Sequence, residues 1–250
     1  MSATAETHAE LRTFYDLRRF AAETPAAETP AAGDAFVAAR RRLPMADGAV
    51  GVFLVRLPAG SGAVEALAAD EFAIVLEGEI ALTSDDGIPH PFGEDASFVL
   101  TKGARFAWSA ARDTTLVVVS YPGGGADVGG GEAPAIVAID RAAALTASKP
   151  PLAELLVGET PSCRSHTDYL SGDGEFVCGV WDSTPYFRKS MLYRHHELMH
   201  LLEGSVTFVD ESGRSQTFAK GDVFFVEAGA HCSWDSREPV AKVYAIHRPA

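Results

Sequence analysis

The sequence predicts an all-β protein made of two barrels in tandem, and three observations carry this prediction. Residues 71–108 recur as residues 197–234 at a constant offset of 126 positions, with ten of the 38 paired positions identical. Runs rich in β-branched residues, such as 50–57 and 114–121, are separated by turn residues. No helical pattern lies between consecutive strands, which is typical of an antiparallel barrel or sandwich. The repeat therefore predicts one β-rich unit used twice.

The repeat divides the 250 residues into four parts. We expect a flexible N-terminal lead-in over 1–34, where a short helix at 8–20 precedes a low-complexity stretch with prolines. The first barrel is expected over 35–122 and the second over 163–250, each long enough to bury a core. Between them, 123–162 is expected to be a glycine-rich linker and a connecting segment with a strand and short helical turns.

Strand alternation predicts which faces are buried. Residues 223–226 are apolar at every position, so both faces of this strand are expected to be covered. One face fills the barrel, and the other packs on the partner barrel or on another subunit. In the strand expected at 205–210, Val206 and Phe208 share one face.

Composition excludes several classes of function. The net charge of −13 and a pI near 5.0 disfavour nucleic acid and an anionic membrane as partners. No apolar run is long enough to cross a bilayer, and the N-terminal residues contain no apolar signal core. Three cysteines at irregular spacings do not form a disulfide framework. We therefore expect a cytoplasmic protein.

The repeated segment resembles the cupin family. The pattern is a glutamate seven residues before a glycine (Glu197 and Gly204), then a turn with Gly213, then GDVFFVEAG. Together with Trp181, Trp234 and Lys242, the second half resembles the cupin branch of (S)-ureidoglycine aminohydrolase and its ethanolamine-utilisation relatives. The first half resembles it less closely, through Glu71, Gly78, Gly103 and Trp108. The resemblance implies a bicupin of two jelly-roll barrels, a fold that hosts enzymes, binding proteins and regulators.

The resemblance also implies a single divalent metal (Mn, Fe, Ni or Zn) in the second barrel, held by three histidines and a glutamate. The glutamate is Glu197, but Met191 and Tyr193 occupy the positions of two histidines and Cys232 that of the third. The remaining candidate ligands are His195, His196, Glu197, His200 and Cys232.

On an extended strand, His195 and Glu197 share one face, while His196 and His200 share the other. If residues 193–196 instead form a hairpin turn, this alternation does not apply to them. The alternative is that Glu197 is ion-paired, for instance with Lys242 or Arg194, and that the histidines are core or surface residues.

The first barrel is expected to be structural. It keeps Glu71 but carries Phe106 at the position of Cys232 and Arg105 at that of His231, and its histidine, His90, falls in a turn.

Several second-barrel residues are candidates for catalysis or binding. Glu197 is a candidate base or ligand, and Cys232 a candidate nucleophile without an assigned base. The candidate walls of a small-molecule pocket are Tyr193, Trp181, Trp234, Lys242 and Tyr244. The alternative for Trp234 is that it fills the barrel.

Three functions follow from these residues. The first is a metal-assisted enzyme acting on a small polar metabolite, which the resemblance implies to be nitrogen-rich or carboxylated. The second is a metal-free module that binds or senses a small ligand. The third is a structural oligomer without catalysis, because pairing of barrels covers exposed sheet edges. A homodimer is expected in each case.

Overall fold

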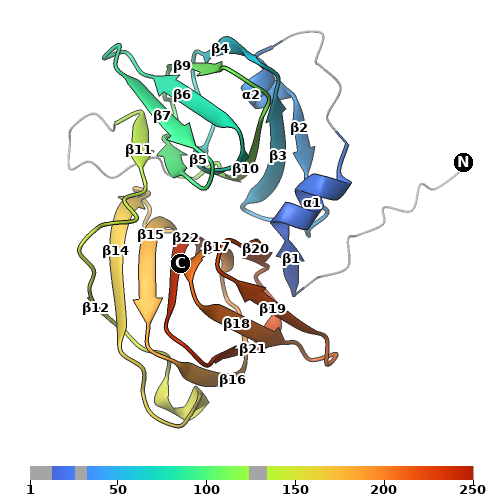
Figure 1. The fold of residues 1–250 in the computed structure, drawn as a ribbon, viewed down its shortest axis with the longest axis vertical. Coiled ribbons are helices and arrows are strands. Elements are labelled where there is room, and N and C mark those ends of the chain that lie inside the picture. Colours follow the sequence, from blue (N-terminus) through green and yellow to red (C-terminus); the bar gives the residue numbers. More distant parts are fainter. Residues whose placement is uncertain (1–12, 26–32, 124–133, 250) are drawn as a thin grey trace, which may run out of the picture.

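Antiparallel strands dominate the chain and form four sheets that pair into two barrels, one above the other in Figure 1. The computed structural model describes residues 13–25, 33–123 and 134–249. The predicted all-β fold is confirmed. The helices are short: α1 (Leu17–Glu23), α2 (Ala35–Ala38) and the 3-10 turn η1 (Ala153–Leu155).

The first barrel consists of two sheets. The larger has the order β11 (Ile136–Ala138), β8 (Ser97–Leu100), β5 (Asp70–Glu77), β10 (Thr114–Tyr121), β3 (Gly51–Leu57) and β2 (Arg40–Arg42). The smaller has the order β4 (Gly60–Val64), β9 (Phe106–Ala110), β6 (Glu79–Thr83) and β7 (Pro89–Gly93).

The second barrel repeats this plan with more strands. Its larger sheet has the order β1 (Phe14–Asp16), β20 (Val223–Val226), β17 (His196–Glu203), β22 (Val240–His247), β15 (Phe176–Ser183), β14 (Cys163–Leu170) and β12 (Thr146–Ser148). Its smaller sheet has the order β13 (Leu156–Val157), β16 (Tyr186–Leu192), β21 (His231–Ser236), β18 (Ser205–Val209) and β19 (Ser215–Ala219).

The glycine between β17 and β18 is a steric requirement. Gly204 has φ +72°, and a Cβ at this position would lie 2.1 Å from the carbonyl oxygen of Pro239. Its counterpart Gly78, between β5 and β6, has φ +90°. A Cβ at Gly78 would lie 2.7 Å from the carbonyl oxygen of Asp113. A left-handed backbone with a neighbouring strand this close accepts only glycine.

The two larger sheets pack back to back and bury a core between the barrels. Strand β20 shows the arrangement: Val223 and Phe225 belong to the core between the barrels. Phe224 and Val226 belong to the core inside the second barrel. The face predicted to pack on the partner barrel or on another subunit therefore packs on the partner barrel of the same chain.

The N-terminal segment joins the second barrel. Strand β1 pairs antiparallel with β20, Phe14 opposite Val226, so part of the expected lead-in is an edge strand. Helix α1 begins only at Leu17, because the Asp16 carboxylate caps it by accepting from Arg19 N at 2.9 Å. Arg18 then bridges the barrels: its guanidinium donates to Gly221 O at 2.7 Å and to Asp95 at 2.5 Å. The low-complexity stretch spans residues 21–32, and its first three residues form the end of α1, contrary to the expected flexible lead-in. Residues 26–32 lie outside the described residues.

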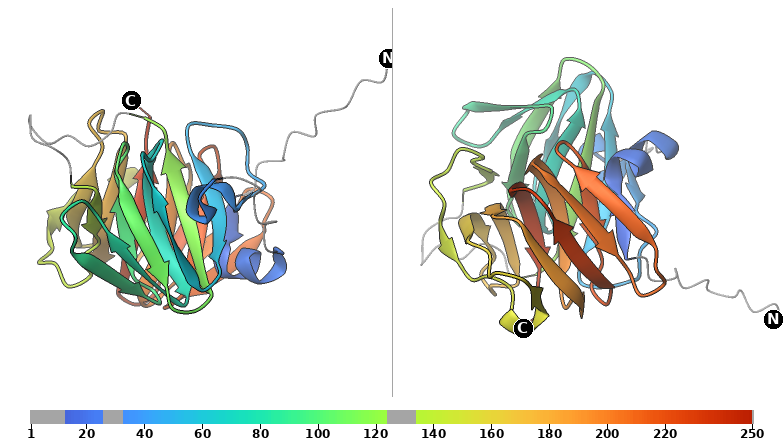
Figure 2. Two further views of the ribbon diagram at one scale, coloured as in Figure 1. Left: turned by 90° about the horizontal axis from the view of Figure 1, so that it is seen from above. Right: turned by 60° about the horizontal axis from the view of Figure 1, so that its bottom comes forward.

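The connecting segment is divided between the barrels. Strand β11 pairs with β8 of the first barrel, and β12 pairs with β14 of the second. Apart from Gly123, the glycine-rich run before β11 lies outside the described residues. In the views of Figure 2, α1 lies on one flank of the molecule.

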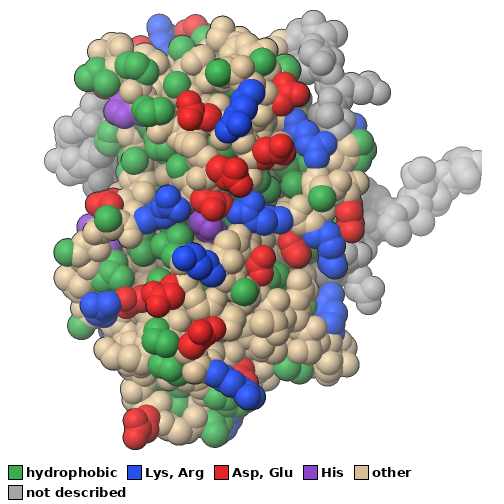
Figure 3. Space-filling model, viewed as in Figure 1, with side chains coloured by type: hydrophobic (Ala, Val, Ile, Leu, Met, Phe, Trp, Pro, Cys, Tyr) green, Lys and Arg blue, Asp and Glu red, His purple; other side chains and the backbone are tan. Residues whose placement is uncertain are grey.

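The surface in Figure 3 carries acidic and basic side chains interspersed, without one extended patch of either sign on that face. Within the described ranges, no helix has the length and apolar character needed to span a membrane.

Phe225→Ala is expected to lower the free energy of unfolding by about 3–5 kcal/mol, because it opens a void in the core between the barrels. Urea unfolding followed by circular dichroism should show one transition, shifted as a whole. Phe187→Ala, at a side chain 37% exposed, is the control and should change stability by less than about 1 kcal/mol. Two separate transitions, only one of them shifted, would show that the barrels unfold independently.

Candidate functional site

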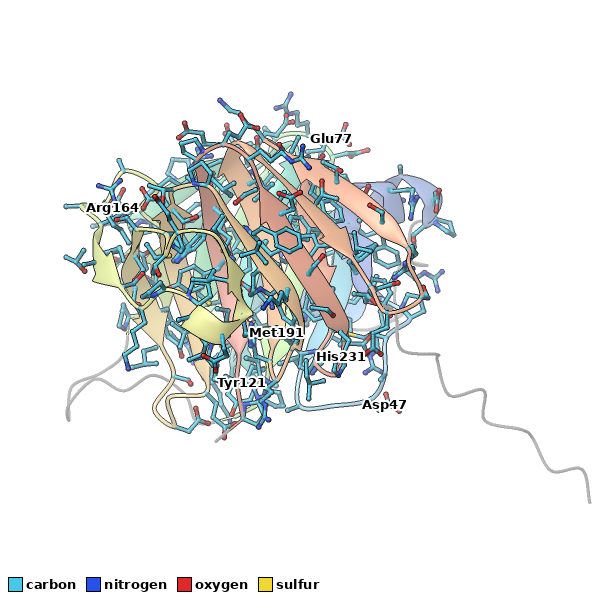
Figure 4. All side chains as sticks on the ribbon, turned by 90° about the horizontal axis from the view of Figure 1, so that it is seen from below. Asp47, Glu77, Tyr121, Arg164, Met191 and His231 are labelled. Carbon is cyan, nitrogen blue, oxygen red and sulfur yellow. The ribbon has the colours of Figure 1, made fainter. Side chains whose placement is uncertain are left out.

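A cavity of about 990 Å³ lies in the second barrel and is lined by strands of both of its sheets. Five aromatic residues are among those that line it: Trp181, Tyr186, Tyr193, Trp234 and Tyr244. Residues 148–155, here called the strap, also contribute to the lining. Figure 4 views the molecule from below and labels Met191, which lies on β16 among the lining residues. An apolar cavity with a few polar groups is the usual form of a small-molecule site.

An ion pair lies at the wall of the cavity. Lys242 Nζ, on β22, donates to Glu197 Oε1 at 2.7 Å, and His195 Nε2 lies 3.2 Å from the other oxygen, Oε2. Glu197 is 5% exposed. Burial raises the pKa of its carboxyl, but Lys242 and His195 outweigh burial and lower the pKa to about 2. Glu197 is therefore a carboxylate at neutral pH, and the predicted alternative of an ion pair with Lys242 is what the geometry shows.

Two tryptophans hold the ammonium group of Lys242. Its Nζ lies 4.8 Å from the ring centre of Trp181 and 5.1 Å from that of Trp234. The two indoles meet edge to face, and Trp234 stacks on Tyr186 at 5.6 Å. Cation–π contacts stabilise a cation most where water is excluded. Trp234 thus fills the barrel and also lines the cavity.

His196 and His200 point away from the cavity, as the alternation of β17 predicts. His196 Nδ1 accepts from Ala228 N at 3.1 Å, and its ring stacks on Phe225 in the core between the barrels. His200 Nε2 lies 3.7 Å from Asp95 of the first barrel. Burial lowers the pKa of both histidines to about 4, so both are neutral at pH 7.

Cys232 is buried inside the second barrel and is not among the cavity-lining residues. Burial raises the pKa of its thiol to about 11, although the nearby Arg188 guanidinium opposes this. A protonated thiol is neither a metal ligand nor a ready nucleophile.

These positions do not fit the metal that the resemblance implies. Met191 and Tyr193 line the cavity at the two histidine positions, and neither is a typical ligand. Of the expected ligands, only His195 and Glu197 share the cavity, because strand parity sends His196 and His200 to the opposite face. In the described part of the chain, no three His, Cys, Asp or Glu side chains are grouped closely enough to hold a metal ion.

Arg188, on β16, is a cavity residue that the sequence did not single out. It is 4% exposed, and its Nη2 donates to Tyr193 Oη and to Cys232 O, both at 3.3 Å. A register shift between Arg188 and Met191 lets Arg188, Met191 and Tyr193 all line the cavity. Parity counted back from Met191 and Tyr193 would place Arg188 on the opposite face of the strand, and the register shift reverses this.

In the first barrel, different side chains occupy the positions equivalent to those that line the cavity of the second barrel. Glu71 pairs with Arg40 through two hydrogen bonds of 2.7 and 2.9 Å. Gly62 lies opposite Trp108, as Arg188 lies opposite Trp234. The Trp108 indole donates to Asp34 at 2.8 Å, and a Cβ at Gly62 would lie 2.6 Å from that indole nitrogen. Packing therefore fills the place that is hollow in the second barrel.

Two jelly-roll barrels joined in one chain define a bicupin. The model of the EutQ-like cupin domain matches residues 45–115 and 170–244, one region in each barrel. The chain belongs to this family of EutQ-like cupins.

Solved structures agree with this assignment. A protein of unknown function of the DUF861 family from Pseudomonas syringae pv. tomato is 31% identical, with a TM-score of 0.77 over 90% of this chain and 96% of that one. The DUF861 protein Ylba from E. coli is 13% identical, with a TM-score of 0.58 over 98% of this chain and 96% of its own. A cupin 2 conserved barrel protein from Leptotrichia buccalis is 9% identical, with a TM-score of 0.55 over 96% and 98% of the two chains. No curated protein matches the chain.

Removing one partner of the Glu197–Lys242 pair is expected to cost more than removing both. Glu197→Leu and Lys242→Met should each lower the free energy of unfolding by about 3–5 kcal/mol, because each leaves a buried charge unpaired. The double variant should lie within about 1 kcal/mol of the wild type. Chemical denaturation of the four proteins gives the coupling energy. If the effects of the two substitutions on the free energy of unfolding are additive, Glu197 and Lys242 do not interact and the prediction is wrong.

Proposed function

We propose that the chain binds a small polar metabolite in the cavity of the second barrel, without a resident metal. The observation that carries this proposal is the Lys242–Glu197–His195 group in an aromatic cavity. The ammonium of Lys242 neutralises the carboxylate of Glu197, which is the residue that would otherwise be the acidic ligand of a divalent metal. The first barrel, whose equivalent space is filled, supports the second by back-to-back packing.

A second candidate function is acid–base catalysis by His195. The carboxylate of Glu197 lies within hydrogen-bond distance of its Nε2, and the His195 side chain is 13% exposed at the cavity wall. A carboxylate that orients an imidazole is a recurring arrangement in enzymes that move protons. Glu197 and Cys232 are weaker catalytic candidates, because the first stays ionised and the second stays protonated at neutral pH.

The cellular location and the oligomeric state of the protein are predictions. Cys163, Cys178 and Cys232 are all thiols outside any disulfide, which supports a reducing cytoplasm. A homodimer is proposed as the solution state, with light scattering as its test.

A metabolite that enters the cavity is expected to change the fluorescence of the protein, because two of the three tryptophans line the cavity. A library of polar metabolites is screened by fluorescence and by thermal shift, before and after treatment with a chelator. Hits should persist after chelation and should raise the melting temperature with concentration.

Trp181→Ala should weaken such hits at least about tenfold, because it removes a wall of the cavity. Trp108→Phe, in the filled first barrel, is the matched control and should leave them unchanged. Loss of every hit on chelation would contradict metal-free binding. Turnover of a hit that His195→Gln abolishes would establish catalysis in place of simple binding.

A further inference from the structure

We infer that the ligand of the second-barrel cavity carries a carboxylate, and that Arg188 is the residue that binds it. This inference rests on the proposed function and specifies its ligand class. Three observations carry it: the state of the Arg188 guanidinium, the balance of charge around the cavity, and the contrast with the first barrel.

The guanidinium of Arg188 is buried without a full set of partners. Its Nη1 has no hydrogen-bond partner, and its Nη2 makes two long bonds of 3.3 Å to Tyr193 Oη and Cys232 O. The guanidinium carbon also lies 5.1 Å from the ring centre of Tyr193. Among the described residues, no carboxylate forms an ion pair with it within 4.0 Å. A buried cation with an unused donor destabilises the unliganded protein unless something else satisfies it.

The charge around the cavity is one-sided. Its basic lining residues are Lys149, Arg188, Arg194, Lys242 and Arg248, whereas Glu197 is the acidic residue among the described lining residues. This balance opposes that of the chain, whose net charge is −13. Glu197 is already compensated by Lys242 and His195. The remaining field in the cavity is therefore positive and favours an anion.

The chemistry of the unused donor selects a carboxylate. A guanidinium presents parallel N–H groups that match the two oxygens of a carboxylate, and Arg is the usual residue for this recognition. Phosphate sites commonly add backbone N–H groups from a helix N-terminus or a glycine-rich loop. The cavity wall here is built from strands and the strap, and the aromatic residues Tyr193 and Trp234 lie beside Arg188. A carboxylate on a compact apolar or aromatic body fits these walls.

The first barrel forms the equivalent strand pairing without an arginine. Gly62 occupies the corresponding place opposite Trp108, and the indole there bonds to Asp34. The same strand pairing thus forms with a glycine in one barrel and with Arg188 in the other.

The test compares carboxylates with neutral amides of similar shape and with inorganic phosphate. The full-length protein is titrated with benzoate, propionate and succinate, with the neutral benzamide and propionamide, and with inorganic phosphate, each to about 10 mM, by thermal shift and calorimetry. The carboxylates should raise the melting temperature with concentration, and the amides should not. A shift with phosphate alone, or equal shifts with acids and amides, overturns the inference. So does the absence of any shift with the carboxylates.

Variants of Arg188 separate binding from folding. Arg188→Met should weaken benzoate binding at least about tenfold while the melting temperature of the unliganded protein stays equal or rises, because a buried unpaired cation is removed. Arg188→Lys should also weaken binding, because an ammonium lacks the planar fork. Arg237→Gln removes an exposed positive charge outside the cavity and is the control for net charge.

The two proposals fail in different ways. If neutral probes change the tryptophan fluorescence and carboxylates do not, the cavity binds small molecules and the carboxylate assignment is wrong. If no probe and no library metabolite binds, both are wrong. If Arg188→Met binds benzoate as the wild type does, Arg188 is not the anchor.

Discussion

The alternation of side chains along β17 is the constraint on which the site depends. Both faces of the larger sheet are buried, one inside the second barrel and one against the first barrel. Each residue of β17 therefore has one of two environments, and neighbours in sequence cannot share one. Glu197 faces the barrel interior, whereas His196 and His200 face the first barrel. Three histidines near one glutamate in sequence thus contribute only His195 to the cavity.

The two barrels share a scaffold but differ in how they neutralise its buried glutamate. Each keeps a buried glutamate at the equivalent position, and each neutralises it with a cation from another strand: Arg40 on β2 in the first, Lys242 on β22 in the second. Arg40 reaches Glu71 from a strand at the sheet edge, and α2 with Asp34 and Trp108 fills the space beside it. In the second barrel the cation comes from the centre of the sheet. The space beside it stays hollow and is lined by aromatic rings.

Much of this arrangement could be predicted from the sequence, because it follows from period-two patterns and from the repeat. The tandem barrels, the apolar faces of residues 223–226 and the separation of His195 and Glu197 from His196 and His200 all follow from them. The pairing of β1 could not be predicted, since three residues carry no periodic signal and their partner lies more than 200 positions away. The place of Arg188 depends on a register shift within β16, which parity alone does not reveal. The choice between Lys242 and Arg194 as partner of Glu197 required the pairing of β17 with β22.

The central claim is that Glu197 is held by an ammonium group, and that the cavity accepts an anion at Arg188. The most direct measurement is a crystal structure of the full-length protein soaked with benzoate, with anomalous data collected at transition-metal absorption edges. The account predicts Lys242 Nζ within hydrogen-bond distance of Glu197, a carboxylate on the guanidinium of Arg188, and no anomalous peak in the cavity. A metal peak beside Glu197, with Lys242 displaced from the carboxylate, would contradict it.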